Sequence, residues 1–406
     1  MIKRNIEKFV IKVLTDYNKM CFVSGPRQSG KTTFAKMLLD IFNQGAYINW
    51  DNLEHQKKII KEPYFFENES RDLKKEFLVV FDEIHKYKNW KNYLKGCYDV
   101  YKDDFKFLVT GSGRLDLFQK GGDSLFGRFF GINLFPFTLG ELENKEQPLW
   151  EDFYNALELG FDVKQFSNTY EQLWNFSGFP EPFLKNNLTF YNLWSNERKK
   201  TLIREDIRNA YLIKDISNIE ILSNILPFKV GSPLSVNSLR EDLNAAYDSI
   251  KKWLIILEQF YYFFQIKPYS KSISRALKKE KKVYLYDWVE IENDSYRFEN
   301  LIALHLFKSV SVWRQMGIGN FELYYLRDKE KREVDFLIVK DNKIECMIEA
   351  KLNDTDISKH LLNFQKKTKT PFAIQVVNKK NVLKRLRKNN LIQYIISADN
   401  LLYYLP

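Results

Sequence analysis

The residues GPRQSGKTT, at positions 25–33, form a glycine-bearing loop of the GxxxxGK[ST] type. They follow a short apolar run and precede an amphipathic one, so a strand should lead into the loop and a helix should leave it. Such a loop surrounds nucleotide phosphates with backbone N–H groups, and the helix N-terminus adds positive potential. We therefore predict an ATP site in which Lys31 reaches the β- and γ-phosphates and Thr32 binds Mg²⁺; the alternative is an ordinary glycine-bearing turn. The residues expected to contact the nucleotide in this loop are Gly25, Pro26, Arg27, Gln28, Ser29, Gly30, Lys31, Thr32 and Thr33.

An acidic pair follows the apolar run FLVVF at residues 77–81. A phosphate-binding loop needs a second Mg²⁺ ligand and a group that orients the attacking water, so we assign Asp82 to the metal and Glu83 to the water. In the alternative, the pair only caps the next helix. Because Glu83 directly follows Asp82, the pattern favours a hydrolytic ATPase over a kinase.

Three more residues are candidates for the same site. The run FKFLVTGSGR, at 105–114, carries Thr110 and Ser112, hydroxyls expected to sense the γ-phosphate or hold the water. Arg128, in FGRFFGINLFPF, is the candidate for an arginine that completes the site from the same or a neighbouring subunit. Its alternative is an ion pair with a surface carboxylate.

A second group of charged residues lies in EVDFLIVKDNKIECMIEAK, at 333–351. Two apolar stretches joined by KDNK predict a hairpin that brings Asp335 near Glu349, with Lys351 two residues further on the same side of its strand. A D and an ExK so placed are the pattern of PD-(D/E)XK nucleases. Asp335 and Glu349, with the carbonyl of Ala350, would then hold Mg²⁺ while Lys351 activates water. The alternative is a buried ion-pair network without catalysis.

Two further residues are expected to join this group. Glu299, in RFENLIALHLF, lies on the apolar face of a predicted helix, which is an unusual position for a carboxylate without a role. Gln375, in the strand-like run FAIQVV, is expected to complete the site.

The formal charge of +11 favours a polyanionic partner, and residues 366–388 hold nine of the basic residues and no acidic one. That run is expected either to follow DNA or to form one solvated helix with Val382, Leu383 and Leu386 packed inward. Upstream, SVNSLREDLNAAYDSIKKWLIILEQF predicts helix, turn, helix, followed by two strands, which is the order of a winged helix. The basic residues expected to contact DNA there, unless this module is a protein adaptor, are Lys251, Lys252, Lys267, Lys271, Arg275, Lys278 and Lys279.

Three scattered cysteines form no CxxC pair, which favours a reducing compartment and argues against zinc clusters. The most hydrophobic segment, WLIILEQFYYFF, is too short to cross a membrane, and the N-terminus does not have the apolar core of a signal peptide. We expect a cytoplasmic protein without a membrane partner.

The elements that position these residues form a multidomain α/β chain. Strands at about 20–23, 46–50, 77–82, 105–110 and 130–135 predict a five-stranded parallel core. The runs GPRQSGKTT, VVFDEIHK, TGSG, GRFFGINLFPFTLGEL, SGFPEPFL and IREDI together resemble the bacterial and archaeal family of AAA-type ATPases that carry a C-terminal domain of unknown function. Where this chain has TGSG the family more often shows two serines, so the sensor role stays open between Thr110 and Ser112.

The resemblance and the patterns together divide the chain into four expected domains. These are an AAA-type P-loop ATPase core at 1–135, a helical lid at 136–225, a winged helix-turn-helix at 226–292 and a PD-(D/E)XK nuclease-like domain at 293–406. Two hypotheses follow. In the first, ATP turnover presents DNA to a Mg²⁺-dependent nuclease; in the second, the chain is an ATP-dependent switch that binds nucleic acid or a protein without cutting. A homo-oligomer is compatible with both.

Overall fold

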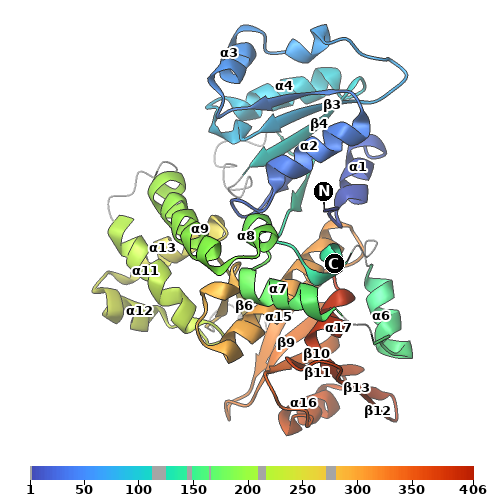
Figure 1. Ribbon diagram of the computed structural model, residues 1–406, viewed down its shortest axis with the longest axis vertical. Helices are drawn as coiled ribbons and strands as arrows, with labels where there is room; N and C mark the ends of the chain where they lie inside the picture. Colours follow the sequence, from blue (N-terminus) through green and yellow to red (C-terminus); the bar gives the residue numbers. More distant parts are fainter. Residues whose placement is uncertain (1, 112–124, 144–148, 164–165, 209–215, 271–279) are drawn as a thin grey trace. The chain divides into compact units, whose positions relative to one another are not determined.

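The glycine loop lies in one unit of the chain, and the D and ExK residues lie in another (Figure 1). The computed structural model describes residues 2–111, 125–143, 149–163, 166–208, 216–270 and 280–406. The first unit spans Lys3–Phe135 and the second contains Pro136–Pro406. Ser112 and the expected wing residues Lys271, Arg275, Lys278 and Lys279 fall outside the described residues.

The first unit is built on a five-stranded sheet in which every neighbouring pair of strands is parallel. The strand order is β2-β3-β4-β1-β5. The predicted five-stranded parallel core is therefore confirmed. Its strands are β1 (Met20–Ser24), β2 (Gly45–Asn49), β3 (Phe77–Asp82), β4 (Phe105–Gly111) and β5 (Phe129–Asn133).

Helices cover both faces of this sheet. Side chains alternate along a strand, so Val79 and Phe81 of β3 face one layer and Leu78 and Val80 face the other. The first face packs with α4 in an aromatic-rich core, while α1 and α2 contact the strands outside that core. Because both faces are covered, β3 and β4 are buried along their whole length, as expected for parallel strands. The helices are α1 (Glu7–Thr15), α2 (Lys31–Phe42), α3 (Leu53–Lys61) and α4 (Trp90–Tyr101).

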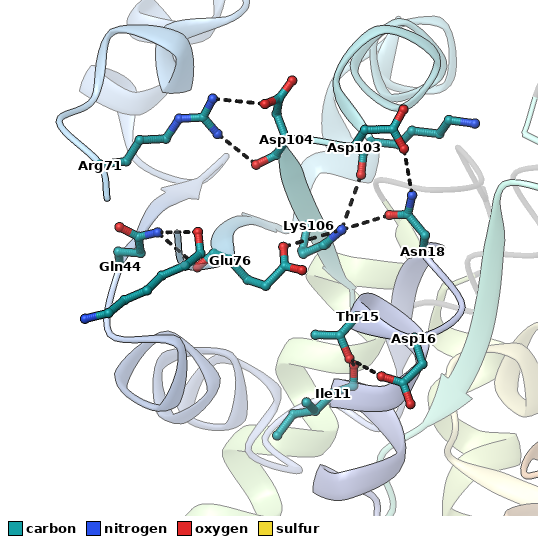
Figure 2. A network of polar contacts seen from close by, with 12 residues as sticks. Ile11, Thr15, Asp16, Asn18, Gln44, Arg71, Glu76, Asp103, Asp104 and Lys106 are labelled. Carbon is teal, nitrogen blue, oxygen red and sulfur yellow. Dashed lines mark hydrogen bonds and ion pairs between the residues drawn. The ribbon is translucent and has the colours of Figure 1, made fainter. Parts of the chain in front are cut away.

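Polar contacts close the end of the sheet where the strands begin (Figure 2). Lys106, at the start of β4, donates from Nζ to Asn18 Oδ1 at 3.0 Å and lies 3.4 Å from Glu76 Oε2. Arg71 donates to the backbone oxygen of Asp104 at 2.8 Å. These contacts pair the charges at the amino ends of the strands. The residues predicted to bind ATP lie at the opposite, carboxyl ends.

The second unit is built on an eight-stranded mixed sheet of order β12-β13-β11-β10-β9-β8-β6-β7. Strands β6 and β7, the first two of this sheet in the chain, pair as an antiparallel hairpin. They join the other strands because β6 pairs in parallel with β8. The expected winged helix-turn-helix and nuclease-like domain thus share one sheet. The strands are β6 (Phe263–Pro268), β7 (Lys282–Leu285), β8 (Phe321–Arg327), β9 (Glu333–Lys340), β10 (Lys343–Lys351), β11 (Phe372–Val377), β12 (Leu383–Lys388) and β13 (Leu391–Ser397).

Two helices pack on opposite faces of this sheet. The long helix α15 (Asp294–Gln315) contacts β7, β8 and β10, and its N-cap Asn293 accepts hydrogen bonds from two backbone N–H groups. Helix α16 (Lys359–Thr368) packs through Leu361 and Phe364 against Leu337 and Met347. The remaining described helices of the unit are α5 (Leu139–Leu142), α6 (Trp150–Leu159), α7 (Ser167–Phe176), α8 (Pro180–Lys185), α9 (Leu188–Thr201), α11 (Ile216–Ile225), α12 (Val236–Leu243), α13 (Tyr247–Gln259) and α17 (Ala398–Tyr403).

Helices from the expected lid pack against the C-terminal part of the chain. Trp150 of α6 stacks edge-on to Trp313 with ring centroids 5.2 Å apart, and Trp288 Nε1 donates to the backbone oxygen of Leu173 at 3.0 Å. Residues 136–225 therefore belong to the second unit. That they close over a nucleotide stays a prediction.

The basic run near the C-terminus does not form the helix that was one of its two expected structures. Residues Leu383–Lys388 form edge strand β12, antiparallel to β13. Leu386 is exposed rather than packed inward. The reason lies in the Asn-Asn turn that follows, where Asn389 has φ 56°, because a positive φ suits a hairpin turn. Exposed lysines and arginines are also typical of edge strands.

Candidate functional site

The glycine loop connects β1 to α2 in the conformation that the sequence predicts. Gly30 caps α2 with φ 92°, a left-handed conformation that glycine adopts without strain. Gly25 lies against the backbone just after β5, since a Cβ there would be 2.2 Å from the carbonyl oxygen of Leu134. Both glycines are thus required by the path of the loop.

Lys31 is held inside the loop. Its side chain is buried, and Nζ donates to the carbonyl oxygens of Gly25 at 3.0 Å and Pro26 at 2.7 Å. Neutral carbonyls are weaker partners for an ammonium than phosphate oxygens are. The lysine is therefore positioned at the loop with partners that an anion can replace.

Asp82 gathers hydroxyl groups from three elements. Its Oδ2 accepts from Thr32 Oγ1 at 2.8 Å and from the Tyr47 hydroxyl at 2.6 Å. Its Oδ1 accepts from the Thr110 hydroxyl. The structure thus brings together Thr32, Asp82 and Thr110, three of the residues selected from sequence.

Tyr47 was missed by the sequence analysis. It lies on β2, whose last residue, Asn49, pairs with Asp82 across the parallel ladder. This pairing brings Tyr47 to Asp82, which lies 35 positions later in the chain. Burial and the hydrogen bond to Asp82 raise the pKa of the Tyr47 hydroxyl well above its usual value. The phenol is therefore a donor to Asp82 and not a base.

Glu83 has a left-handed backbone with φ 56°, which is uncommon for a residue other than glycine. Its N–H donates to the carbonyl of Thr110 at 3.0 Å. The carboxylate Oε2 lies 3.5 Å from Lys86 Nζ and 3.6 Å from His85 Nε2. Burial lowers the pKa of His85, and the charge of Glu83 opposes that shift.

Arg128 does not point to this site from within its own chain. It precedes β5, where its carbonyl accepts from Met20 N at 3.0 Å, so it lies at the end of the sheet away from the loop. Its guanidinium forms a bidentate pair with Asp99, with Nε to Oδ1 at 2.6 Å and Nη2 to Oδ2 at 2.9 Å. In the isolated chain, Arg128 therefore forms the ion pair with a carboxylate that was the alternative interpretation of this residue. Action on a neighbouring subunit stays a prediction.

The residues of the first unit fit a hydrated magnesium ion. Mg²⁺ prefers hard oxygen ligands, keeps several waters and takes one or two protein groups beside the substrate phosphates. Thr32 and Asp82 present such oxygens 2.8 Å apart next to Lys31. They would hold the ion if it enters with ATP.

In the second unit, the predicted hairpin is confirmed. Strands β9 and β10 are antiparallel, and Asp341 and Asn342 form the turn with φ 48° and 66°. Asp335 Oδ2 accepts from the N–H of Ala350 at 3.0 Å, and Lys351 Nζ lies 2.7 Å from Glu349 Oε1. The D and ExK residues are therefore brought together at one end of the hairpin.

Gln375 has a different role from the one expected. Its amide nitrogen donates to the carbonyls of Asp354 and Asp356, both at 2.8 Å, and its oxygen accepts from Ser358 N at 2.8 Å. The side chain thus holds the loop that leads into α16. Because Gln375 pairs with Glu349 across the parallel strands β10 and β11, its part in the site stays a prediction.

Lys282 is the partner of the buried carboxylates that sequence did not reveal. It is 1% exposed, and Nζ lies 3.1 Å from Glu299 Oε1, in contact with Glu333 and 3.6 Å from Asp335 Oδ1. Tyr284, on the same face of β7, donates to Glu299 Oε1 at 2.7 Å. The period-two spacing of these two residues was the only signal in the sequence.

The carboxylate cluster around Lys282 consists of Glu299, Glu333, Asp335 and Glu349, and two of its members have a raised pKa. Burial, with the charge of Asp335, raises the pKa of Glu299 to about 7 although Lys282 opposes the shift. Burial also raises the pKa of Glu349. Burial alone would lower the pKa of Lys282, but the carboxylates around it raise it above the usual value.

The cluster as arranged does not fit the expected divalent metal. Among the described residues there is no group of three or more His, Cys, Asp or Glu side chains placed to hold a metal ion. The ammonium of Lys282 lies between Glu299, Glu333 and Asp335 instead. The alternative interpretation, a buried ion-pair network, describes this arrangement.

Comparison with known proteins matches three consecutive segments to family models. Residues 17–143 match an AAA domain, residues 167–288 match a domain of unknown function, DUF8612, and residues 297–398 match a second, DUF4143. With the loop geometry, the first match supports an AAA-type P-loop domain over these residues. No helix of the described residues is long and apolar enough to cross a membrane.

The chain is also similar to two curated proteins along most of their length. An uncharacterised protein of Methanocaldococcus jannaschii is 25% identical over 396 residues, covering 91% of this chain and 82% of the relative. One from Haemophilus influenzae is 20% identical over 361 residues, covering 81% of each. Among solved structures, AMPPCP-bound DnaA from Aquifex aeolicus is 13% identical, covers 64% of this chain and 89% of its own, and has a TM-score of 0.32. A likeness this slight supports no conclusion about function.

Proposed function

We propose that the first unit binds Mg²⁺·ATP and hydrolyses it. The observation that supports this most directly is the 2.8 Å hydrogen bond between Thr32 and Asp82, beside the buried ammonium of Lys31. Magnesium bound there would neutralise charge on the β- and γ-phosphates. The AAA domain match over residues 17–143 agrees with this assignment.

Each residue has a role that follows from its present partners. Lys31 exchanges two neutral carbonyls for phosphate oxygens, which bind an ammonium more strongly. Thr110 keeps Asp82 oriented through its second oxygen. Glu83, at the carboxyl end of β3, orients the attacking water.

ATP binding is tested by replacing the loop lysine. Lys31→Ala should weaken binding of a fluorescent ATP analogue by about a hundredfold, because a charge-assisted contact of roughly 1.5–3 kcal/mol is lost for each phosphate bond. Lys61→Ala, an exposed lysine of α3, is the matched control and should leave binding unchanged. Equal affinity of the two variants would reject the site.

For the second unit, we propose DNA binding without cleavage, as the outcome that the geometry favours over a nuclease. The edge strand β12 exposes Lys384, Arg385, Arg387 and Lys388 along one hairpin. Lys384 and Lys388 lie on one face of the strand and Arg385 and Arg387 on the other, because side chains alternate. Basic residues that share a face neutralise backbone phosphates in a sequence-independent way. ATP turnover would then change how the chain holds DNA.

DNA binding is tested through its salt dependence. Replacing Lys384 and Lys388, which lie on one face of β12, with Gln should lower the slope of log K against log salt by about 2, since each lost phosphate contact removes about 0.9. Lys200→Gln, at an exposed position of α9, is the control. An unchanged slope in the double variant would place the DNA contact elsewhere.

Cleavage remains the second candidate, because Asp335, Glu349 and Lys351 do come together. It predicts Mg²⁺- or Mn²⁺-dependent nicking of supercoiled DNA that Lys351→Ala abolishes. Lys343→Ala, at the exposed start of the same strand, is the control. Absence of nicking by the unaltered chain supports binding without cleavage.

A further inference from the structure

The carboxylate cluster of the second unit collects four acidic side chains from three elements. Glu333 and Asp335 lie on the same face of β9 because side chains alternate along a strand. Glu299 comes from α15, and Glu349 comes from β10, next to the residue that pairs with Phe336. Carboxylates this close repel one another unless cations lie between them.

Lysines supply most of the compensating charge. Lys282 contacts Glu299, Glu333 and Asp335, and Lys351 contacts Glu349. Each of these four carboxylates therefore has an ammonium within 4 Å. Within the described residues these are the two ammonium groups of Lys282 and Lys351, and the guanidinium of Arg327 lies 3.8 Å from Glu333. Lys282 is the central one, since it alone touches three of the four.

One carboxylate oxygen of the cluster still has no hydrogen-bond partner within the described part of the chain. Glu349 is 5% exposed, its Oε1 faces Lys351, and its Oε2 is buried without a hydrogen bond. A buried, unpaired carboxylate oxygen is costly, by about 1–3 kcal/mol or more. Glu349 Oε2 is therefore available to an additional cation or donor.

The space around Lys282 is bounded by backbone as well as by side chains. Gly231 has φ 74°, and a Cβ added there would be 3.1 Å and 3.3 Å from the two carboxylate oxygens of Glu299. The backbone thus covers Glu299 on that side. Lys282 reaches this carboxylate from the first position of β7.

We infer that the ammonium of Lys282 is the resident cation of this cluster and excludes a divalent metal from it. Without Lys282, the cluster becomes a site for one hard divalent cation such as Mn²⁺ or Mg²⁺, bound by carboxylate oxygens of Asp335, Glu349 and Glu299. The reason is that Glu299 and Asp335, whose side chains are only 14% and 15% exposed, would lose the ammonium that compensates their charge and must gain either protons or another cation. Oxygen-rich groups of this kind are the usual ligands of these ions. The inference rests on the proposed binding without cleavage and deepens it, because a cluster that takes Lys282 as its cation would not take up the metal that cleavage needs.

The test measures Mn²⁺ binding to the full-length chain without nucleotide or DNA, from the electron paramagnetic resonance signal of free Mn²⁺. Lys282→Met should bind one more equivalent of Mn²⁺ than the unaltered chain, and Mn²⁺ should raise its melting temperature. Adding Asp335→Asn to that variant should remove the extra equivalent. Lys281→Met, a change of the lysine that directly precedes β7, should behave like the unaltered chain.

A second comparison does not depend on how well Lys282→Met folds. The unaltered chain and Glu349→Gln should give the same Mn²⁺ titration, because the cluster holds no metal while Lys282 is present. If Glu349→Gln loses an equivalent of Mn²⁺, or if folded Lys282→Met gains none, the inference is overturned. Because no DNA is present, these outcomes are separate from a failure of the proposed DNA binding.

Discussion

Replacing Gly25 with alanine tests whether the glycine loop depends on its close approach to the backbone just after β5. A Cβ at this position would lie 2.2 Å from the carbonyl oxygen and 3.1 Å from the carbonyl carbon of Leu134. Leu134 is itself fixed, since its N–H donates to the carbonyl of Ser24 at 2.7 Å. Backbone therefore meets backbone, and no flexible side chain can move aside.

The size of the effect follows from that distance. A carbon and a carbonyl oxygen usually lie about 3.3 Å or more apart, so the loop or the backbone at Leu134 must shift by about 1 Å. Over-packing of this kind costs about 1–3 kcal/mol of unfolding free energy. A shift of about 1 Å at a phosphate site also lowers turnover by about a hundredfold.

Two measurements on the same protein check this prediction. Urea unfolding followed by circular dichroism gives the loss of stability, and phosphate release gives ATP turnover. The matched control is Gly131→Ala in β5, where an added Cβ would meet no atom within 4 Å. If Gly25→Ala has the stability and turnover of Gly131→Ala, the argument from close approach is refuted.

Two further predictions concern buried charge in the second unit. Burial lowers the pKa of His305 to about 4 from the ordinary 6.5, so the unfolded chain binds more protons and the unfolding free energy falls as pH decreases through this window. Between pH 7 and pH 5 the loss is about 2 kcal/mol. Burial raises the pKa of Asp287 to about 6 and that of Glu299 to about 7, which acts in the opposite direction. The check is therefore the difference in urea unfolding between the unaltered chain and His305→Gln; parallel pH profiles would contradict it. Lys308 Nζ lies 2.6 Å from Glu141 Oε2, and both side chains are buried, so Lys308→Met should cost about 3–5 kcal/mol by removing the charge partner of a buried carboxylate. Adding Glu141→Leu should restore most of the loss in thermal unfolding, and a double variant no more stable than the single one would count against this explanation.

The ATPase core could be predicted from sequence because its signals are local. Strand, loop and helix follow one another directly around Gly30, and the apolar run before Asp82 reads as a buried parallel strand. Tyr47 was missed because its contact with Asp82 depends on the pairing of β2 with β3. The order of strands is a property of the whole sheet and cannot be read from the sequence of β2 or of β3 alone.

Part of the carboxylate cluster could be predicted because the hairpin that forms it is also a local feature of the sequence. The turn at Asp341 and Asn342 marks the hairpin that joins Asp335 to Glu349. Lys282 reaches this cluster only because β6 and β7 join the same sheet from 50 residues or so upstream. The sequence therefore indicated that a cation must compensate the charge of these carboxylates. It did not show whether that cation is a metal ion or a lysine.

The basic run shows how a local pattern can mislead. Leu383 and Leu386 are three residues apart, which suits a helix, but five of the six residues in β12 are exposed. There was little apolar surface for a helix to bury, and the turn at Asn389 allows pairing with the strongly apolar β13. Pairing with β13 decided the structure of this segment.

The central claim, that the first unit hydrolyses ATP with Glu83 orienting the water, is tested most directly by phosphate release from Glu83→Gln. The matched control is Glu62→Gln, an exposed position in the same unit. We predict that Glu83→Gln binds ATP with unchanged affinity but releases phosphate about 10²–10⁴-fold more slowly, because one acid–base group is lost. Turnover equal to that of Glu62→Gln would contradict the claim.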